Sequence, residues 1–96
     1  MGERPEAVPT VLIDNERVRV TEWRFAPGAA TGWHRHEYDY VVVPLTTGRL
    51  RLEETGGERI AELSVGAPYF RQAGVEHDVV NANDFEFAFI ETELKT

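Results

Sequence analysis

The chain has 96 residues, of which 42% are hydrophobic and 28% charged, and its 17 acidic residues exceed the 10 basic ones to give a formal charge of −7. This length and composition predict one packed globular domain, residues 1–96, rather than a disordered or fibrous chain. The negative charge disfavours nucleic acid and anionic membranes as partners, and the absence of cysteine excludes disulfides, thiolate metal ligands and cysteine nucleophiles.

The first ten residues predict a loose N-terminal arm or edge segment. They are mostly polar, include Pro5 and Pro9, and contain no apolar core of a signal peptide. No stretch of the chain approaches the roughly 18 apolar residues that a membrane-spanning helix requires. We therefore expect a cytoplasmic protein.

Short strands are predicted from residue 11 onward. The apolar run 11–13 ends at an Asp-Asn turn pair, and Val18 and Val20 then alternate with arginines as in a half-buried strand. This alternation shifts by one residue before Trp23 and Phe25, which predicts a β-bulge at that point.

The second half of the chain continues the same pattern. Residues 50–52 and 60–63 are apolar segments separated by a Thr-Gly-Gly turn, which predicts a hairpin. Phe85, Phe87 and Phe89 alternate along a further strand, and we expect them, with Trp33 and Phe70, to lie mainly in the core. No window shows the periodicity of an amphipathic helix, so eight or nine strands forming a sandwich or barrel are expected.

Two of the three histidines lie two positions apart, in the segment GWHRHEYDY. On a strand, side chains at i and i+2 point to the same face, so the imidazoles of His34 and His36 can converge on one ion. A third ligand must come from another strand, because two neighbours on one strand cannot surround a metal. His77 is the remaining histidine.

Glycines and an asparagine surround the histidines at regular spacing. The residues that define this spacing are Gly28, His34, His36, Gly48, Gly66, Gly74, His77 and Asn81. Residues 28–81 thereby resemble the two motifs of the cupin family, G-x5-H-x-H-x3–4-E-x6-G and G-x5-P-x-G-x2-H-x3-N. The resemblance implies an all-β cupin jelly-roll β-barrel, or double-stranded β-helix, in which the three histidines bind a divalent metal ion.

The resemblance is incomplete at two positions. The glutamate ligand of the family would follow His36 after three or four residues, where this chain has Tyr40 and Val41. Counting back from Gly48 selects Val41, whereas strand parity from His36 selects Tyr40, so the sequence leaves both positions open. Gln72 replaces the motif proline, which affects a turn and no ligand.

Without the glutamate, no ligand of the site carries a negative charge, so a bound divalent ion keeps its full positive charge. This predicts the chemistry that the metal can support. Three neutral imidazoles would leave up to three positions open on six-coordinate iron, enough for a bidentate substrate and dioxygen. Three-histidine cupins include oxygenases that cleave β-diketones, and the chain is also similar to short cupins associated with β-alanine degradation. We therefore predict an iron(II)-dependent dioxygenase acting on a small anionic or dicarbonyl substrate, with zinc, nickel or manganese as alternative metals.

Two other functions remain open at this point. The same site can support non-oxidative chemistry by an isomerase, decarboxylase or lyase, which oxygen consumption would distinguish from the first prediction. The barrel can also be a non-catalytic ligand-binding or sensing module.

Several neighbouring residues are candidates for substrate contacts. Tyr40 shares strand parity with the histidines, and Arg71, near the His77 turn, is the arginine we select to bind a substrate carboxylate. Glu37 and Asp39 are expected to point away from the site. Because a barrel of this size exposes edge strands, we also expect a homodimer formed through the N-terminal strand or through packed sheets.

Overall fold

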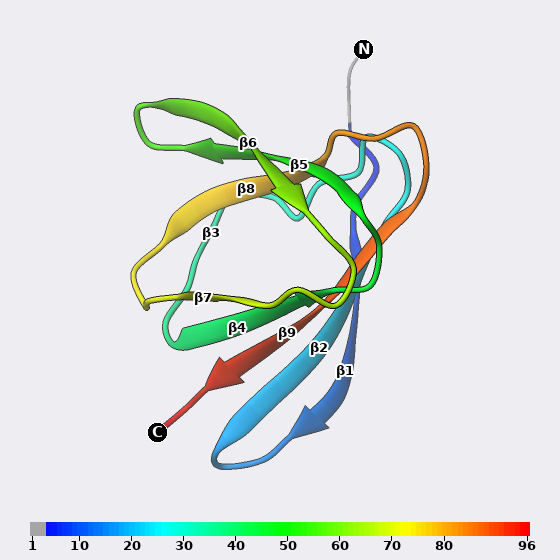
Figure 1. Ribbon diagram of the computed structural model, residues 1–96. Coiled ribbons are helices and arrows are strands. Elements are labelled where there is room, and N and C mark those ends of the chain that lie inside the picture. Colours follow the sequence, from blue (N-terminus) through cyan, green and yellow to red (C-terminus); the bar gives the residue numbers. More distant parts are fainter. Residues whose placement is uncertain (1–3) are drawn as a thin grey trace.

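The computed structural model describes residues 4–96, which form two facing β-sheets with antiparallel ladders (Figure 1). The strand order is β1-β2-β9-β4-β7 in the five-stranded sheet and β3-β8-β5-β6 in the four-stranded sheet. The strands are β1 (Val8–Asp14), β2 (Val18–Phe25), β3 (His34–Arg35), β4 (Asp39–Pro44), β5 (Gly48–Glu54), β6 (Gly57–Leu63), β7 (Tyr69–Arg71), β8 (Glu76–Asn81) and β9 (Phe87–Leu94). The predicted all-β jelly roll is confirmed.

The chain crosses repeatedly between the two sheets, so strands distant in sequence become neighbours. β9 lies between β2 and β4, and β8 lies between β3 and β5. The predicted hairpin is present as β5 and β6, which pair from Gly48 with Leu63 to Glu54 with Gly57. Over residues 4–96 there is no helix of the length and apolarity needed to cross a membrane.

Inward-facing apolar side chains of both sheets form the core. Phe25 and Phe87 are fully buried, and Leu50 is 1% exposed. The rings of Phe25 and Phe89 lie 5.5 Å apart between centroids. Burial alternates along β4, whose buried residues face this core, as period-two patterning requires.

The N-terminal arm is shorter than predicted, because β1 already begins at Val8. Residues 1–3 of the predicted arm lie outside the described residues. Pro9 is compatible with β1 because this strand is at the edge of its sheet, where a missing N–H costs no ladder hydrogen bond. β1 pairs only with β2 among the described strands, and all of its residues are exposed.

The predicted bulge before Trp23 is wrong. β2 pairs with β9 in unbroken register from Val18 to Phe25, and the irregularity lies instead on β1, between Val11 and Ile13. Val20 therefore faces away from the core, on the side opposite buried Phe25. Apolar residues on the outer face of the sheet produced the false shift in alternation.

The expectation that the aromatic side chains lie mainly in the core is also only partly correct. Phe87 and Phe89 are buried, but Trp33, Phe70 and Phe85 are 55%, 53% and 45% exposed. Phe70 belongs to the outer face of β7, since its partner Val41 on β4 alternates with the buried Tyr40. Phe85 precedes β9 and lies in a turn region.

A buried asparagine joins three segments near one end of the barrel. The side-chain amide of Asn81, 2% exposed, donates to the carbonyls of Phe25, Ala26 and Phe85 at 3.2, 3.2 and 2.8 Å. Its oxygen accepts from the backbone and side-chain N–H groups of Asn83 at 2.9 and 2.7 Å. The motif asparagine thus fixes the end of β8 to the chain that leaves β2.

Candidate metal centre

A short antiparallel ladder between β3, in the first motif, and β8, in the second motif, places His34 and His77. β3 pairs with β8, and His34 lies directly opposite His77. Paired residues of an antiparallel ladder present their side chains on the same face. The two imidazoles are accordingly close, with ring centroids 4.8 Å apart.

His36 follows β3 and is held by the turn that precedes β8. Its N–H donates to the carbonyl of Val75 at 2.9 Å, and its carbonyl accepts from the N–H of Gly74 at 2.8 Å. Gly74 has φ +100°, which favours glycine in this turn. These two bonds keep His36 on the same side of the chain as His34, as the i, i+2 spacing predicts.

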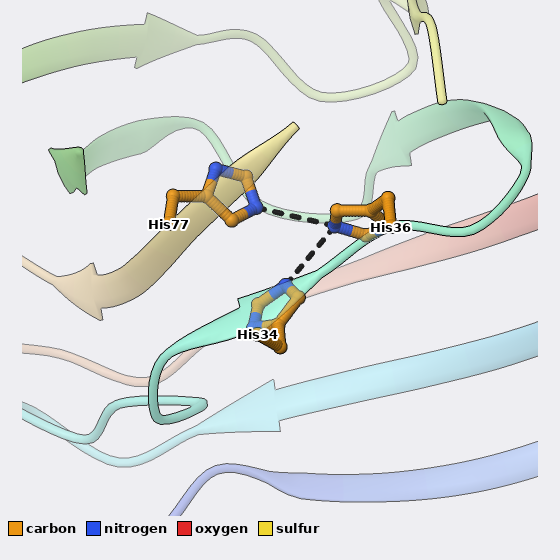
Figure 2. A group of neighbouring side chains, drawn as sticks. All are labelled: His34, His36 and His77. Carbon is orange, nitrogen blue, oxygen red and sulfur yellow. Dashed lines mark hydrogen bonds between the residues drawn. The ribbon is translucent and has the colours of Figure 1, made fainter. Parts of the chain in front are cut away.

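The three imidazoles converge, and their candidate ligand atoms all lie within 4.8 Å of one another (Figure 2). Nε2 of His36 lies 3.0 Å from Nε2 of His34 and 3.2 Å from Nε2 of His77. For metal–nitrogen bonds of about 2.05 Å, ligand nitrogens at octahedral or tetrahedral angles are about 2.9–3.4 Å apart. The predicted group of histidines is therefore assembled and can hold a metal ion.

The outward-facing ring nitrogens of the three histidines have different surroundings. Nδ1 of His34 lies 2.9 Å from the carbonyl oxygen of Gly32 and 3.3 Å from Oγ1 of Thr31. Within the described part of the chain, Nδ1 of His77 is buried and has no hydrogen-bond partner. Nδ1 of His36 instead lies 3.3 Å from Oε2 of Glu91.

Glu91 is a residue of this site that the sequence reasoning missed. It lies on β9, is 7% exposed, and accepts a hydrogen bond from Nε1 of Trp23 through Oε1 at 2.8 Å. Burial raises the pKa of Glu91 to about 7, and the nearby Glu93 contributes further to this increase. A signal was present in the sequence, because the alternation of Phe87 and Phe89 continues to Glu91 and points its side chain inward.

Burial also keeps His36 and His77 neutral, as metal ligands must be. Desolvation, followed by the charges of His34 and His77, lowers the pKa of His36 from 6.5 to about 3. Desolvation and then His34 lower the pKa of His77 to about 4. The Arg71 guanidinium contributes to both decreases, so its charge acts on the histidine cluster.

The structure distinguishes the two positions that could replace the family glutamate. Tyr40 is 3% exposed and its ring stacks on His36, with centroids 3.9 Å apart and planes at 17°. Val41 faces the outer side of the sheet. Asp39 accepts a hydrogen bond from the N–H of Ala73 at 2.8 Å, and neither it nor the exposed Glu37 belongs to the histidine cluster.

Arg71 faces the interior from β7. It is paired across the ladder with Tyr40, and its ion pair with Glu54 is long, with Nη2 3.7 Å from Oε2. The space enclosed by Arg71, Tyr40 and the histidines measures about 20 Å³, which is room for one or two water-sized groups. A wider hollow of about 380 Å³ lies next to it and is also lined by His34 and His36.

Comparison with known proteins gives consistent results. The family model described as a cupin domain matches residues 21–93. The chain is 63% identical over 95 residues to the beta-alanine degradation protein BauB of Pseudomonas aeruginosa, covering 99% of this chain and 100% of that protein. Among solved structures, a cupin domain from Bordetella pertussis is 58% identical, covers 100% of both chains and has a TM-score of 0.98. The polyketide cyclase RemF of Streptomyces resistomycificus shares the fold at 24% identity, covering 99% of this chain and 71% of that one with a TM-score of 0.72.

Proposed function

The chain belongs to the cupin domain family, and we propose that it is a metal-dependent enzyme acting at His34, His36 and His77 on a small anionic dicarbonyl substrate. The observation that carries this proposal is the convergence of the three imidazoles, with Nε2 of His36 3.0 and 3.2 Å from those of His34 and His77 and all candidate ligand atoms within 4.8 Å of one another. A divalent ion bound there supplies Lewis acidity toward a chelating oxo group and, when it is iron(II), reactivity toward dioxygen. Iron(II) is the metal we propose, with zinc, nickel or manganese supporting the non-oxidative alternative.

The substrate class follows from the chemistry of β-alanine together with the surroundings of the histidines. The relative from Pseudomonas aeruginosa is named for β-alanine degradation. Transamination of this three-carbon 3-amino acid, in which an acceptor 2-oxo acid takes the amino group and is reduced, converts it into a 3-oxo acid, which is a small anion with oxygens in a 1,3 arrangement. The hollow of about 380 Å³ lined by His34 and His36 has room for a molecule of this size, whereas the space of about 20 Å³ beside Arg71 admits only one end of it.

We assign substrate contacts to Arg71 and Tyr40. The guanidinium of Arg71 faces the histidines, and among residues 4–96 its ion pair is the long one with Glu54, so it can bind a substrate carboxylate. Burial raises the pKa of the Tyr40 phenol above its ordinary value, so Tyr40 stays protonated and can donate a hydrogen bond to a substrate oxygen. Its stacking on His36 fixes the position of the ring.

Metal content tests the ligand assignment. Untagged protein purified anaerobically should contain about one iron per chain by elemental mass spectrometry, and His34→Ala or His77→Ala should lose it while circular dichroism still shows the β-fold. Arg35→Ala is a matched control, because this exposed side chain lies between His34 and His36 in sequence and contacts Glu76 at 3.5 Å. A histidine variant that retains stoichiometric metal would show the assignment to be wrong.

Kinetics with two substrates tests the role of Arg71. With a 3-oxo acid, Arg71→Gln should raise KM by roughly 10–100-fold, the loss expected for one charge-assisted contact, and should leave KM for a neutral β-diketone nearly unchanged. Oxygen uptake during turnover would support the dioxygenase, whereas product formed without oxygen uptake would favour an isomerase, decarboxylase or lyase. Ligand binding without any product would favour the non-catalytic module.

We further propose a homodimer in which a second copy of this chain covers β1 and the outer face of the five-stranded sheet. The exposed apolar residues of β1 are Val8, Val11, Leu12 and Ile13. One row of paired residues crosses this sheet. It runs from Ile13 to Val20, through Thr92 to Val41, and on to Phe70. Exposed apolar surfaces and edges of this kind commonly mark association sites.

Light scattering tests the dimer. The wild-type protein should have twice the 10.9 kDa mass of the chain, and Ile13→Lys should convert it to monomer. Ile60→Lys is the control, since Ile60 is as exposed as Ile13 but lies on β6 in the other sheet. A monomeric wild type would refute the interface. The cytoplasmic location also stays a prediction, to be tested by fractionating cells that express the chain.

A further inference from the structure

Glu91 is a buried acid in contact with only one of the three histidines. Its carboxylate lies between Trp23, whose Nε1 is 2.8 Å from Oε1, and His36, whose Nδ1 is 3.3 Å from Oε2. A carboxylate that is 7% exposed must be held by donors, because its burial without them is costly. Glu91 lies outside residues 28–81, which contain the two cupin motifs.

Trp23 and His36 determine the hydrogen-bonding role of each carboxylate oxygen of Glu91. The Trp23 indole N–H can only donate, so it fixes one carboxylate oxygen as an acceptor. The neutral imidazole of His36 has one N–H, which can be on either ring nitrogen. An acceptor at Oε2 favours the proton on Nδ1, and Nε2 then keeps its lone pair toward His34 and His77.

We propose that Glu91, held by Trp23, is a positioning residue that keeps His36 in the Nδ1–H tautomer, with the lone pair of Nε2 directed toward His34 and His77, where a metal would bind. The metal part of this inference rests on the proposed function, whereas the tautomer part concerns the metal-free chain. Outer carboxylates that orient a ligating histidine typically contribute a factor of about 10–100 to metal affinity.

The isosteric variant Glu91→Gln provides the test. The amide has one acceptor and one donor end, so it cannot accept from both Trp23 and His36. If its oxygen remains with Trp23, its NH₂ group faces Nδ1 of His36 and favours the Nε2–H tautomer. Imidazole ¹⁵N NMR of metal-free protein should therefore show Nδ1–H in the wild type and a shift toward Nε2–H in the variant. Zinc affinity, measured by competition with a chromophoric chelator, should fall about 10–100-fold.

A double variant distinguishes positioning from a general structural effect. Trp23→Phe removes the indole donor and keeps an aromatic ring, so in Trp23→Phe/Glu91→Gln the introduced amide can turn its oxygen to His36. This double variant should recover the Nδ1–H tautomer and part of the zinc affinity. Glu93→Gln is the matched control, because Glu93 is two residues further along β9 and contacts Arg19 at 3.4 Å instead of a histidine.

The possible results separate this inference from the proposed function. An Nε2–H tautomer of His36 in the wild type, or a Glu91→Gln variant with unchanged tautomer and zinc affinity, would overturn the inference. Equal loss of affinity in Glu93→Gln would also overturn it. If wild-type protein bound no metal but the tautomer changed as expected, the proposed enzyme would be refuted and the orienting role of Glu91 toward His36 would stand.

Discussion

Replacing Asn81 by alanine should strongly destabilise the metal-free barrel. The side chain is 2% exposed, its two amide hydrogens are shared among the carbonyls of Phe25, Ala26 and Phe85, and its oxygen accepts two bonds from Asn83. A net loss of about 1 kcal/mol for each of these roughly four bonds, reduced by any water that enters, gives about 3 kcal/mol. For a domain of this size, the melting temperature should fall by roughly 12–24 °C.

Urea denaturation and calorimetry with chelator present would measure this loss. Asn15→Ala is the matched control, because the Asn15 oxygen also accepts two backbone bonds, at 2.8 and 3.0 Å, but in an exposed turn where water can replace it. The control should lose only about 0.5–1 kcal/mol. Equal losses in the two variants would refute the reasoning that the buried hydrogen bonds of Asn81 contribute more to stability than the exposed ones of Asn15.

Three further predictions concern the same barrel. Gly48→Ala should cost about 1–2 kcal/mol in urea denaturation, because its Cβ would lie 2.8 Å from Oδ1 of Asn83; an unchanged midpoint would contradict this. Below pH 6.5 the metal-free protein should lose stability, since His36 and His77 have folded pKa values of about 3 and 4 and the unfolded chain binds more protons. Glu91, with a folded pKa of about 7, binds one extra proton in the folded chain down to its ordinary value of 4.5, so stability should fall with a net slope of about one proton rather than two between pH 6.5 and 4.5; a slope of two protons over this range would argue against these protonation states. Zinc at 100 times its Kd should stabilise the fold by about 2.7 kcal/mol and EDTA should reverse the effect, whereas an unchanged melting temperature would argue against a metal site.

The histidine group could be predicted because its geometry is local or encoded by turns. The i, i+2 spacing puts His34 and His36 on one face without any knowledge of the fold. The glycine and asparagine spacing that resembles the cupin motifs brings in His77, which the structure places directly opposite His34. The jelly roll was predictable for the same reason, since short strands between turn residues exclude a helical fold.

Other features could not be predicted from the sequence, because they depend on which strands are neighbours in the sheet. Glu91 reaches His36 only because β9 lies beside β4 in the sheet, and no local pattern reveals that adjacency. The sequence could not decide whether Tyr40 or Val41 takes the position of the family glutamate, because that depends on the register of β4. The bulge predicted before Trp23 was wrong because alternation was interpreted as if apolar side chains always face the core, whereas Val20 lies on an apolar outer face.

The three histidines are held in place before a metal binds, and this affects which metal the site selects. The backbones of His34, His36 and His77 are placed by ladder and turn hydrogen bonds, and contacts of Nδ1 orient the rings of His34 and His36, so few torsions remain to be ordered when an ion arrives. Binding then carries a small entropic cost, which benefits every divalent ion that accepts nitrogen ligands. Such a preformed triangle ranks first-row metals largely by their intrinsic affinity for imidazole, in which copper and zinc exceed iron. Occupancy by iron(II) would therefore depend on the supply of free metals in the cell at the time the barrel is filled.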